Sequence, residues 1–139
     1  MAFWYYEGTK DYLVQGLPAV VLTFKASGSI TAGRFVALDA GGTTDVYQPT
    51  AAINSVANPV GVALHTASDD DPVAVLVWGV AKNLSFANSE ETVTPGCMVT
   101  VSGSGQLTSG SAYIVGRILS GSATRLMCFV DCMKVLSTD

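Results

Sequence analysis

The stretch Thr31-Ala32-Gly33-Arg34-Phe35-Val36-Ala37-Leu38 decides the fold, because its pattern recurs at Thr94-Pro95-Gly96-Cys97-Met98-Val99-Thr100-Val101. Each copy is a glycine turn that opens a short apolar strand. Further matches follow in the same order, and they are Val60–Leu64 with Val115–Leu119 and Ala74–Val77 with Leu126–Phe129. The chain therefore contains an internal repeat, in which a turn and a strand precede a hairpin.

Outward from this repeat, the sequence reads as short strands separated by turns. Nine stretches concentrate or alternate Val, Leu, Ile and Thr, and turn residues bound them. They are Ala19–Lys25, Arg34–Leu38, Asp45–Tyr47, Pro59–Leu64, Val73–Ala81, Cys97–Val101, Gln106–Thr108, Ala112–Leu119 and Arg125–Val130. This spacing predicts an all-β fold: a small β-barrel or sandwich built from two similar halves, with an extended N-terminal arm.

The length of 139 residues suits one domain with its own core. We predict an N-terminal aromatic arm over residues 1–16 and a single β domain over 17–139, with repeat-like halves at about 27–81 and 90–132. Each half alone would leave a sheet edge and an apolar face unpaired, so the two must pack together.

Charge and hydropathy exclude two classes of partner. The net charge is -4, and the seven basic residues are scattered singly, so neither nucleic acid nor an anionic lipid surface is an expected partner. The longest apolar run, Val73 to Ala81, is about half of the roughly 20 residues that cross a bilayer. Hydrophobic residues make up 49% of the chain and charged residues only 13%, so we expect other chains to cover part of its surface.

Candidate reactive residues are few. His65 is the only imidazole, no Gly-x-Ser-x-Gly elbow occurs, and Gly8-Thr9-Lys10 lacks the remainder of a phosphate loop. Cys97, Cys128 and Cys132 are odd in number and contain no Cys-x-x-Cys pair, which predicts free, buried thiols rather than disulfides or a zinc site.

Two acidic clusters remain as candidates. Asp69-Asp70-Asp71 offers hard oxygen ligands for a divalent cation, but it lacks the alternate spacing of a calcium loop and reads better as a solvated turn. Glu90-Glu91 lies in another polar loop, and the same interpretation applies. We therefore predict no catalytic residue, no cofactor and no metal, and the chain is not expected to be an enzyme.

The first twelve residues are unusual. They hold five of the twelve aromatic residues, whereas chain termini are usually polar, and these five are Phe3, Trp4, Tyr5, Tyr6 and Tyr12. Two interpretations stay open. The segment is either an edge strand over the chain's own barrel, or an arm that contacts a neighbouring subunit or another protein, as aromatic anchors often do.

With these features placed, the pattern resembles the capsid decoration, or cement, proteins of tailed double-stranded DNA bacteriophages. The resemblance covers about residues 27–130. It is carried by Thr31–Val36, Pro59–Ala63, Val73–Val80 with Trp78-Gly79, Thr94–Val99 and Ile114–Ile118. The aromatic arm lies outside it, and the stretch from Asp45 to Asn58 is longer than is usual in the family.

The resemblance implies a structural protein of the virion, made in the host cytoplasm. Such a protein binds the outer surface of the expanded icosahedral capsid, clamps neighbouring major capsid protein subunits and is often a homotrimer. One alternative is a phage tail or surface β-domain that binds carbohydrate or a host receptor. A small hydrolase using Glu90, Glu91 or the Asp69–Asp71 cluster is the second.

Overall fold

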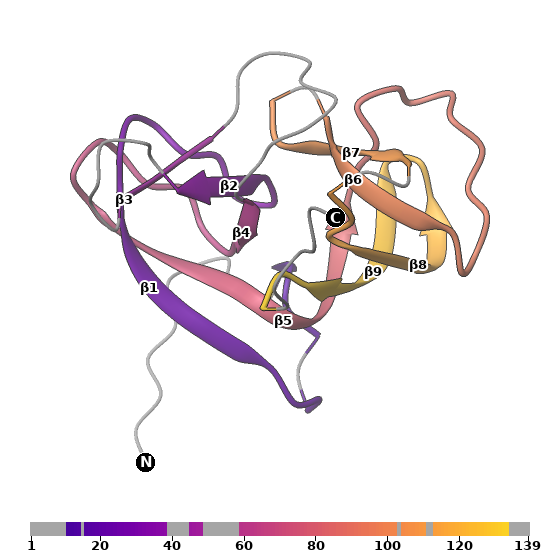
Figure 1. Ribbon diagram of the computed structural model, residues 1–139, viewed down its shortest axis with the longest axis horizontal. Helices are drawn as coiled ribbons and strands as arrows, with labels where there is room; N and C mark the ends of the chain where they lie inside the picture. The colour runs from indigo at the N-terminus through magenta and orange to yellow at the C-terminus, as the bar shows by residue number, and fades with distance from the viewer. Residues whose placement is uncertain are drawn as a thin grey trace, which may run out of the picture.

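The computed structural model describes residues 11–14, 16–38, 45–48, 59–102, 104–110 and 113–133, and this part of the chain is built of β-strands (Figure 1). Its strands are β1 Val20–Ala26, β2 Phe35–Leu38, β3 Asp45–Tyr47, β4 Pro59–Ala63, β5 Pro72–Leu84, β6 Met98–Ser102, β7 Gln106–Ser109, β8 Gly116–Ser122 and β9 Arg125–Asp131. The prediction of an all-β fold is confirmed. Within these residues, no helix has the length and apolar character needed to cross a membrane.

Most strand ends agree with the predicted ones to within one residue, whereas β5 and β8 have ends that differ by three or four. β5 continues to Leu84, three residues past the predicted end at Ala81. β8 begins at Gly116 instead of Ala112, and Tyr113 has a φ of 51°, which interrupts an extended chain there. Part of the predicted arm, residues 1–10, and the predicted turn at Asp39 to Gly42 lie outside the described residues.

The sheet order is β1-β3-β2-β4-β5-β9-β8-β6-β7, and β1 also pairs with β5. The first five strands therefore close into a barrel. The other strands continue from the later part of β5, and a parallel bridge from Phe86 to Leu107 connects β7 back to the chain just after β5. We call β1–β4 with the start of β5 the first half, and β6–β9 with the end of β5 the second half. Figure 1 shows β5 running from one half into the other.

Backbone hydrogen bonds recur between the two halves. The Gly33 N–H donates to the carbonyl oxygen of Ala63 at 2.7 Å, and the Gly96 N–H donates to that of Ile118, also at 2.7 Å. Gly33 and Gly96 have φ angles of 83° and 87°, a conformation that favours glycine. The two turns that the sequence alignment pairs therefore have the same backbone geometry in the structure.

The pairing of the first strand in each half also recurs. In the first half, the Ser27 N–H, just after β1, donates to the Val46 oxygen at 2.7 Å. In the second half, the Ala87 N–H, just after β5, donates to the Leu107 oxygen at 2.8 Å. The end of β5 therefore has the role in the second half that β1 has in the first.

The strand registers match as well. Val36 pairs with Gly61, and Val99 pairs with Gly116. Both glycines lie where a Cβ atom would overlap a backbone carbonyl oxygen, that of Leu76 for Gly61 and that of Phe129 for Gly116. Close approach of the neighbouring backbone therefore requires glycine at both positions.

This geometry corrects one part of the sequence alignment. Val62 pairs with Leu76 and Arg117 pairs with Phe129, so Leu76 corresponds to Phe129 rather than to Cys128. The alignment of Ala74–Val77 with Leu126–Phe129 was wrong by one residue. Both stretches are apolar throughout, so their composition does not distinguish neighbouring registers, whereas backbone pairing does.

Two buried clusters fill the molecule. One lies inside the first half and consists of Ala26, Ile30, Val36, Val46, Ala63, Ala67, Val73, Val75 and Val77. The other joins the halves, because it contains Phe35, Val62 and Leu76 from the outer side of the first half together with Val99 and Ile118 of the second. The outside of the first half is thus buried against the second half.

Candidate functional site

Of the predicted interface aromatics, Tyr12 is the one that lies in the described residues; Phe3, Trp4, Tyr5 and Tyr6 lie outside them. Tyr12 is half-buried against the cluster that joins the halves. Its carbonyl oxygen accepts a hydrogen bond of 2.9 Å from the Lys82 N–H, and its ring lies against Gly33. The segment around Tyr12 is therefore part of the packed molecule.

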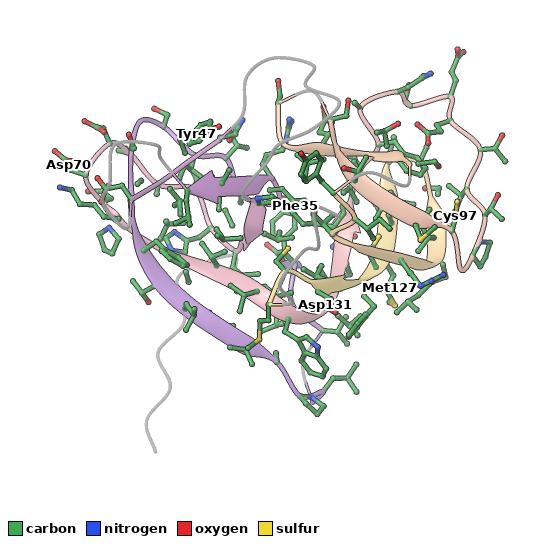
Figure 2. All side chains as sticks on the ribbon, viewed as in Figure 1. Phe35, Tyr47, Asp70, Cys97, Met127 and Asp131 are labelled. Atoms are coloured by element: carbon green, nitrogen blue, oxygen red, sulfur yellow. The ribbon has the colours of Figure 1, made fainter. Side chains whose placement is uncertain are left out.

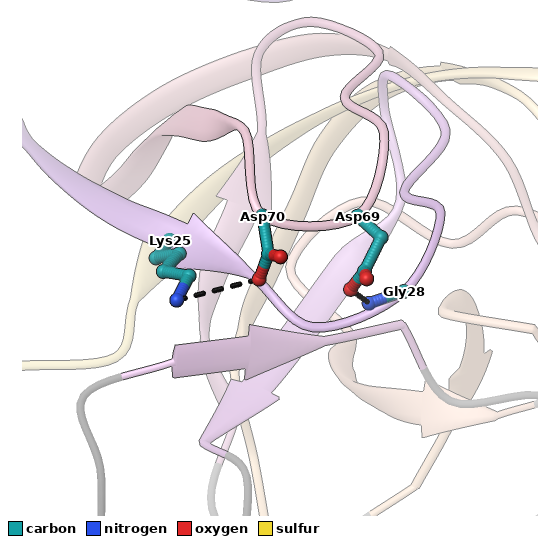
Figure 3. A network of polar contacts seen from close by, with 4 residues as sticks. All are labelled: Lys25, Gly28, Asp69 and Asp70. Carbon is teal, nitrogen blue, oxygen red and sulfur yellow. Dashed lines mark hydrogen bonds and ion pairs between the residues drawn. The ribbon is translucent and has the colours of Figure 1, made fainter.

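The three carboxylates of the acidic turn have separate partners, and Figure 3 shows those of Asp69 and Asp70. Asp69 accepts a hydrogen bond from the Gly28 N–H at 2.7 Å, and Asp71 accepts one from the Ser68 N–H at 3.3 Å. Asp70 forms an ion pair with Lys25 at 3.3 Å. The carboxylates thus cap turns and pair with a lysine, which supports the interpretation of this cluster as a solvated turn.

The same ion pair acts on Lys25. A hydrogen bond from its ammonium group to Asp70, together with the charge of that carboxylate, raises the pKa of Lys25. Both side chains are mostly exposed, so the pair is screened by water and contributes little to stability.

The second acidic cluster has a structural contact of its own. Glu91 accepts hydrogen bonds from the Thr108 hydroxyl at 3.2 Å and from the Ser109 N–H at 2.8 Å. It therefore fastens the loop before β6 to strand β7. The Glu90 N–H donates to the Asn88 side chain at 3.0 Å, as in an Asx turn. Over the described residues, no group of three or more His, Cys, Asp or Glu side chains is arranged to hold a metal ion.

His65 is buried beside the hairpin of β4 and β5. Its Nε2 accepts a hydrogen bond from the Ala74 N–H at 3.0 Å, and its Nδ1 lies 3.0 Å from the Thr66 carbonyl oxygen. Because the first contact needs a lone pair on Nε2, the proton is on Nδ1, which donates to Thr66. The imidazole thus takes the place of a backbone carbonyl as acceptor for the Ala74 N–H, next to the end of the pairing between β4 and β5.

Cys97, Cys128 and Cys132 are not joined in disulfides. Cys128 is buried in the cluster that joins the halves, and burial raises the pKa of its thiol to about 12. A thiol in this state is a poor nucleophile at neutral pH. Cys97 and Cys132 are half-buried and pack against the same cluster.

The sequence did not show which apolar side chains of the β domain are exposed. They are Leu17, Val21, Leu22, Tyr113, Leu119 and Met133. Strand alternation alone does not show which side of a strand faces solvent when both sides are apolar. Figure 2 shows Phe35 in the middle of the molecule and Met127 near its margin, although both belong to apolar strands.

Comparison with solved structures finds the same fold in two phage assemblies. One is the head fiber gp8.5 N base in bacteriophage phi29, with a TM-score of 0.58, 15% identity and coverage of 86% of this chain and 100% of that chain. The other belongs to the capsid of Myoviridae Phage XM1, with a TM-score of 0.64, 15% identity and coverage of 86% and 87%. No curated protein matches the sequence.

The family comparison is more specific, because the phage cement protein family matches residues 14–126. This range includes the first half of the fold and the second half up to the start of β9, and it leaves out most of the aromatic segment. It agrees with the resemblance predicted from the glycine turns. The chain belongs to the phage cement protein family, and it is a structural decoration protein of the phage capsid.

Proposed function

We propose that this protein binds the outer surface of the expanded icosahedral head and clamps neighbouring major capsid protein subunits. The proposal includes a homotrimer as the functional unit, contact through the aromatic segment at Phe3, Trp4, Tyr5, Tyr6 and Tyr12, and no role for nucleic acid. The aromatic segment and the domain of residues 17–139 would then have separate tasks, attachment and rigidity.

The observation that carries this proposal is the combination of a rigid, apolar interior with apolar side chains left at the surface. Leu22 and Leu119 are 47% and 45% exposed and lie in different halves. Exposed apolar side chains on more than one face suit a protein that contacts several neighbours at once. Attachment at several points stabilises a shell by mass action, since the bound protein favours the assembled state.

The proposal also holds that the protein catalyses no reaction. Three observations support this part. The carboxylate of Glu91 is bound to β7, the turn carboxylates cap N–H groups or pair with Lys25, and His65 holds the β4–β5 hairpin. Each of these side chains has a structural contact that a catalytic group would have to give up.

The experiment is co-sedimentation of purified protein with expanded heads that lack it. We expect saturable binding and a higher melting temperature of the decorated heads. The number of homotrimers bound at saturation tests the clamp, since one trimer between three neighbouring subunits gives about one trimer for every three major capsid protein chains. Absence of binding, or binding without a change in head melting, would contradict the proposal.

A further inference from the structure

The outer surface of the second half differs from its counterpart in the first half. In the first half, the outward positions of β2, β4 and β5 are buried, and they are Phe35, Val62, Leu64, Ala74 and Leu76. The registers and the alignment of Val60–Leu64 with Val115–Leu119 give their counterparts as Met98, Arg117, Leu119, Met127 and Phe129, with Leu119 at a register shift in β8. These are half-buried or exposed, with Leu119 at 45%. The outward side of the first half is thus buried within the molecule, whereas the equivalent side of the second half is partly or fully exposed to solvent.

The open surface is continuous across four strands. Met98, Arg117, Phe129 and Val80 are direct register partners in β6, β8, β9 and β5, so their side chains lie in one row on one side of the sheet. Trp78 packs edge-on against Phe129, with ring centroids 5.3 Å apart. We call this row, together with Leu119, Met127 and the turn at Gly96, the outer face.

The first half shows what kind of group covers its glycine turn. The ring of Tyr12 lies against Gly33 so closely that a Cβ atom there would overlap the ring. At Gly96, the counterpart of Gly33, no atom of the described part of the chain, apart from its own neighbours in sequence, lies within 4 Å of the position that a Cβ would occupy. An aromatic ring of the N-terminal segment thus covers one turn, and the equivalent turn is open.

The chemistry of the outer face suits aromatic side chains. Met98 and Met127 offer thioether sulfur, which contacts aromatic rings favourably. The Arg117 guanidinium donates a hydrogen bond of 3.0 Å to the Gly96 carbonyl oxygen, which holds a planar cation beside the open turn. A guanidinium fixed in this way is a platform for a cation–π contact. The segment Phe3-Trp4-Tyr5-Tyr6 is the matching part of the same sequence.

The described start of the chain indicates which copy supplies this segment. The carbonyl oxygen of Asp11 accepts a hydrogen bond from Asn83 at 2.6 Å, and the Val14 N–H donates to the Val80 oxygen at 3.3 Å. Ala81 pairs with Leu13 on one edge of β5 and with Cys128 of β9 on the other, so the segment lies on the edge of β5 opposite to β9, β8 and β6, which carry most of the outer face. Ten further residues extend about 33 Å at most, enough to reach a neighbouring molecule.

We infer that the outer face is the docking site for the N-terminal aromatic segment, Phe3 to Tyr6, of a second copy of this chain. This inference rests on the self-association in the proposed function and names the surfaces that make it. The contact joins two different surfaces, so each copy gives its segment to one neighbour and receives one from another. A head-to-tail contact of this kind closes into a trimer when each copy is rotated by one third of a turn relative to the next.

The test uses the full chain without capsids, studied by sedimentation equilibrium. Leu119→Glu places a charge on the outer face, deletion of residues 1–10 removes the segment, and Thr23→Glu is the control at an exposed position of β1. We expect the wild type to self-associate and the first two variants to raise the dissociation constant by about 30-fold or more, as hot-spot changes do. The control should remain unchanged. Arg117→Ser is a second variant of the face, should Leu119→Glu fail to fold.

Mixing the two defective proteins gives the decisive result. The deletion variant keeps an intact face and Leu119→Glu keeps an intact segment, so their mixture should form complexes that neither forms alone. A monomeric wild type, or a mixture that stays monomeric, would overturn the inference. If such a protein still binds expanded heads, the decoration role stands and only the docking inference fails.

Discussion

Two glycines fix how closely the strands approach at the centre of each half. Gly61 and Gly116 lie where a side chain would overlap the carbonyl oxygens of Leu76 and Phe129. Their place is the same in both halves, although the residues around them differ. At the residue scale, the repeat is therefore preserved as backbone geometry more than as side-chain identity.

Gly116→Ala tests this point. The added methyl group meets backbone that cannot rotate away, so we expect a loss of about 1–3 kcal/mol in the free energy of unfolding, as for an overpacked core. Urea denaturation measures it. Gly28→Asn is the control, because no atom of the described residues lies near the position of a Cβ atom at Gly28, and asparagine tolerates its left-handed φ of 84°. Equal stability of Gly116→Ala and wild type would show that the strands separate at no cost.

The raised pKa of Cys128 predicts that the protein loses stability at alkaline pH. Burial raises the pKa of its thiol from 9.0 to about 12, so between these values the unfolded chain loses a proton that the folded chain keeps. Stability is then full below pH 9 and falls as pH rises toward 12, by up to about 1.4 kcal/mol per pH unit.

The matched variant is Cys128→Val, since the counterpart of Cys128 in the first half is Val75. We expect this variant to unfold at nearly the same denaturant concentration at pH 7 and to lose less stability than wild type between pH 9 and 11. Parallel pH curves for the two proteins would mean that other groups cause the alkaline loss.

At the scale of elements, β5 connects the two halves. Its first part pairs with β1 and β4, and its later part pairs with β9 and with the segment around Leu13. The hairpin that leads into β5 is completed by a side chain, because His65 accepts the hydrogen bond of the Ala74 N–H. The end of this hairpin thus depends on one imidazole.

His65→Leu should therefore destabilise the protein. Leucine fills similar space but leaves the buried Ala74 N–H without its acceptor, which costs about 1–3 kcal/mol. Thermal or urea unfolding measures the loss, and hydrogen exchange at Ala74 should become faster. Ser68→Ala, at an exposed position in the same turn, serves as the comparison and should change stability little. A stable His65→Leu protein with slow exchange at Ala74 would refute the structural role.

At the scale of the whole molecule, the aromatic segment divides into a packed part and a part that precedes it. Tyr12 and Leu13 pack against the cluster that joins the halves, and Tyr12 and Val14 are hydrogen-bonded to β5. The predicted boundary of the arm at residue 16 places these residues in the arm. Because of these contacts, a deletion that tests binding to the capsid should end before Asp11.

Two deletions separate attachment from folding. Removal of residues 1–10 should leave the melting temperature of the free protein unchanged and weaken binding to expanded heads. Removal of residues 1–16 should in addition reduce the free energy of unfolding by about 1–3 kcal/mol, because it removes a half-buried aromatic ring and its hydrogen bonds. Calorimetry and co-sedimentation measure the two effects. If the shorter deletion unfolds the protein, the first ten residues belong to the core.

The sequence by itself determined the strands, the repeat and the family. Short apolar stretches bounded by turn residues predict strands because alternation and turn chemistry are local properties of the chain. The glycine turns at Gly33 and Gly96 carried the resemblance to phage cement proteins, and their geometry in the structure is the same.

Only the tertiary structure decided which apolar positions are covered. Phe35 and Met98 occupy equivalent places in the repeat, yet Phe35 is buried between the halves and Met98 lies on the outer face. The role of β5 in both halves, and the one-residue correction in β9, likewise depend on pairing between distant segments. Burial depends on what packs against a strand, and a strand's own sequence does not contain that information.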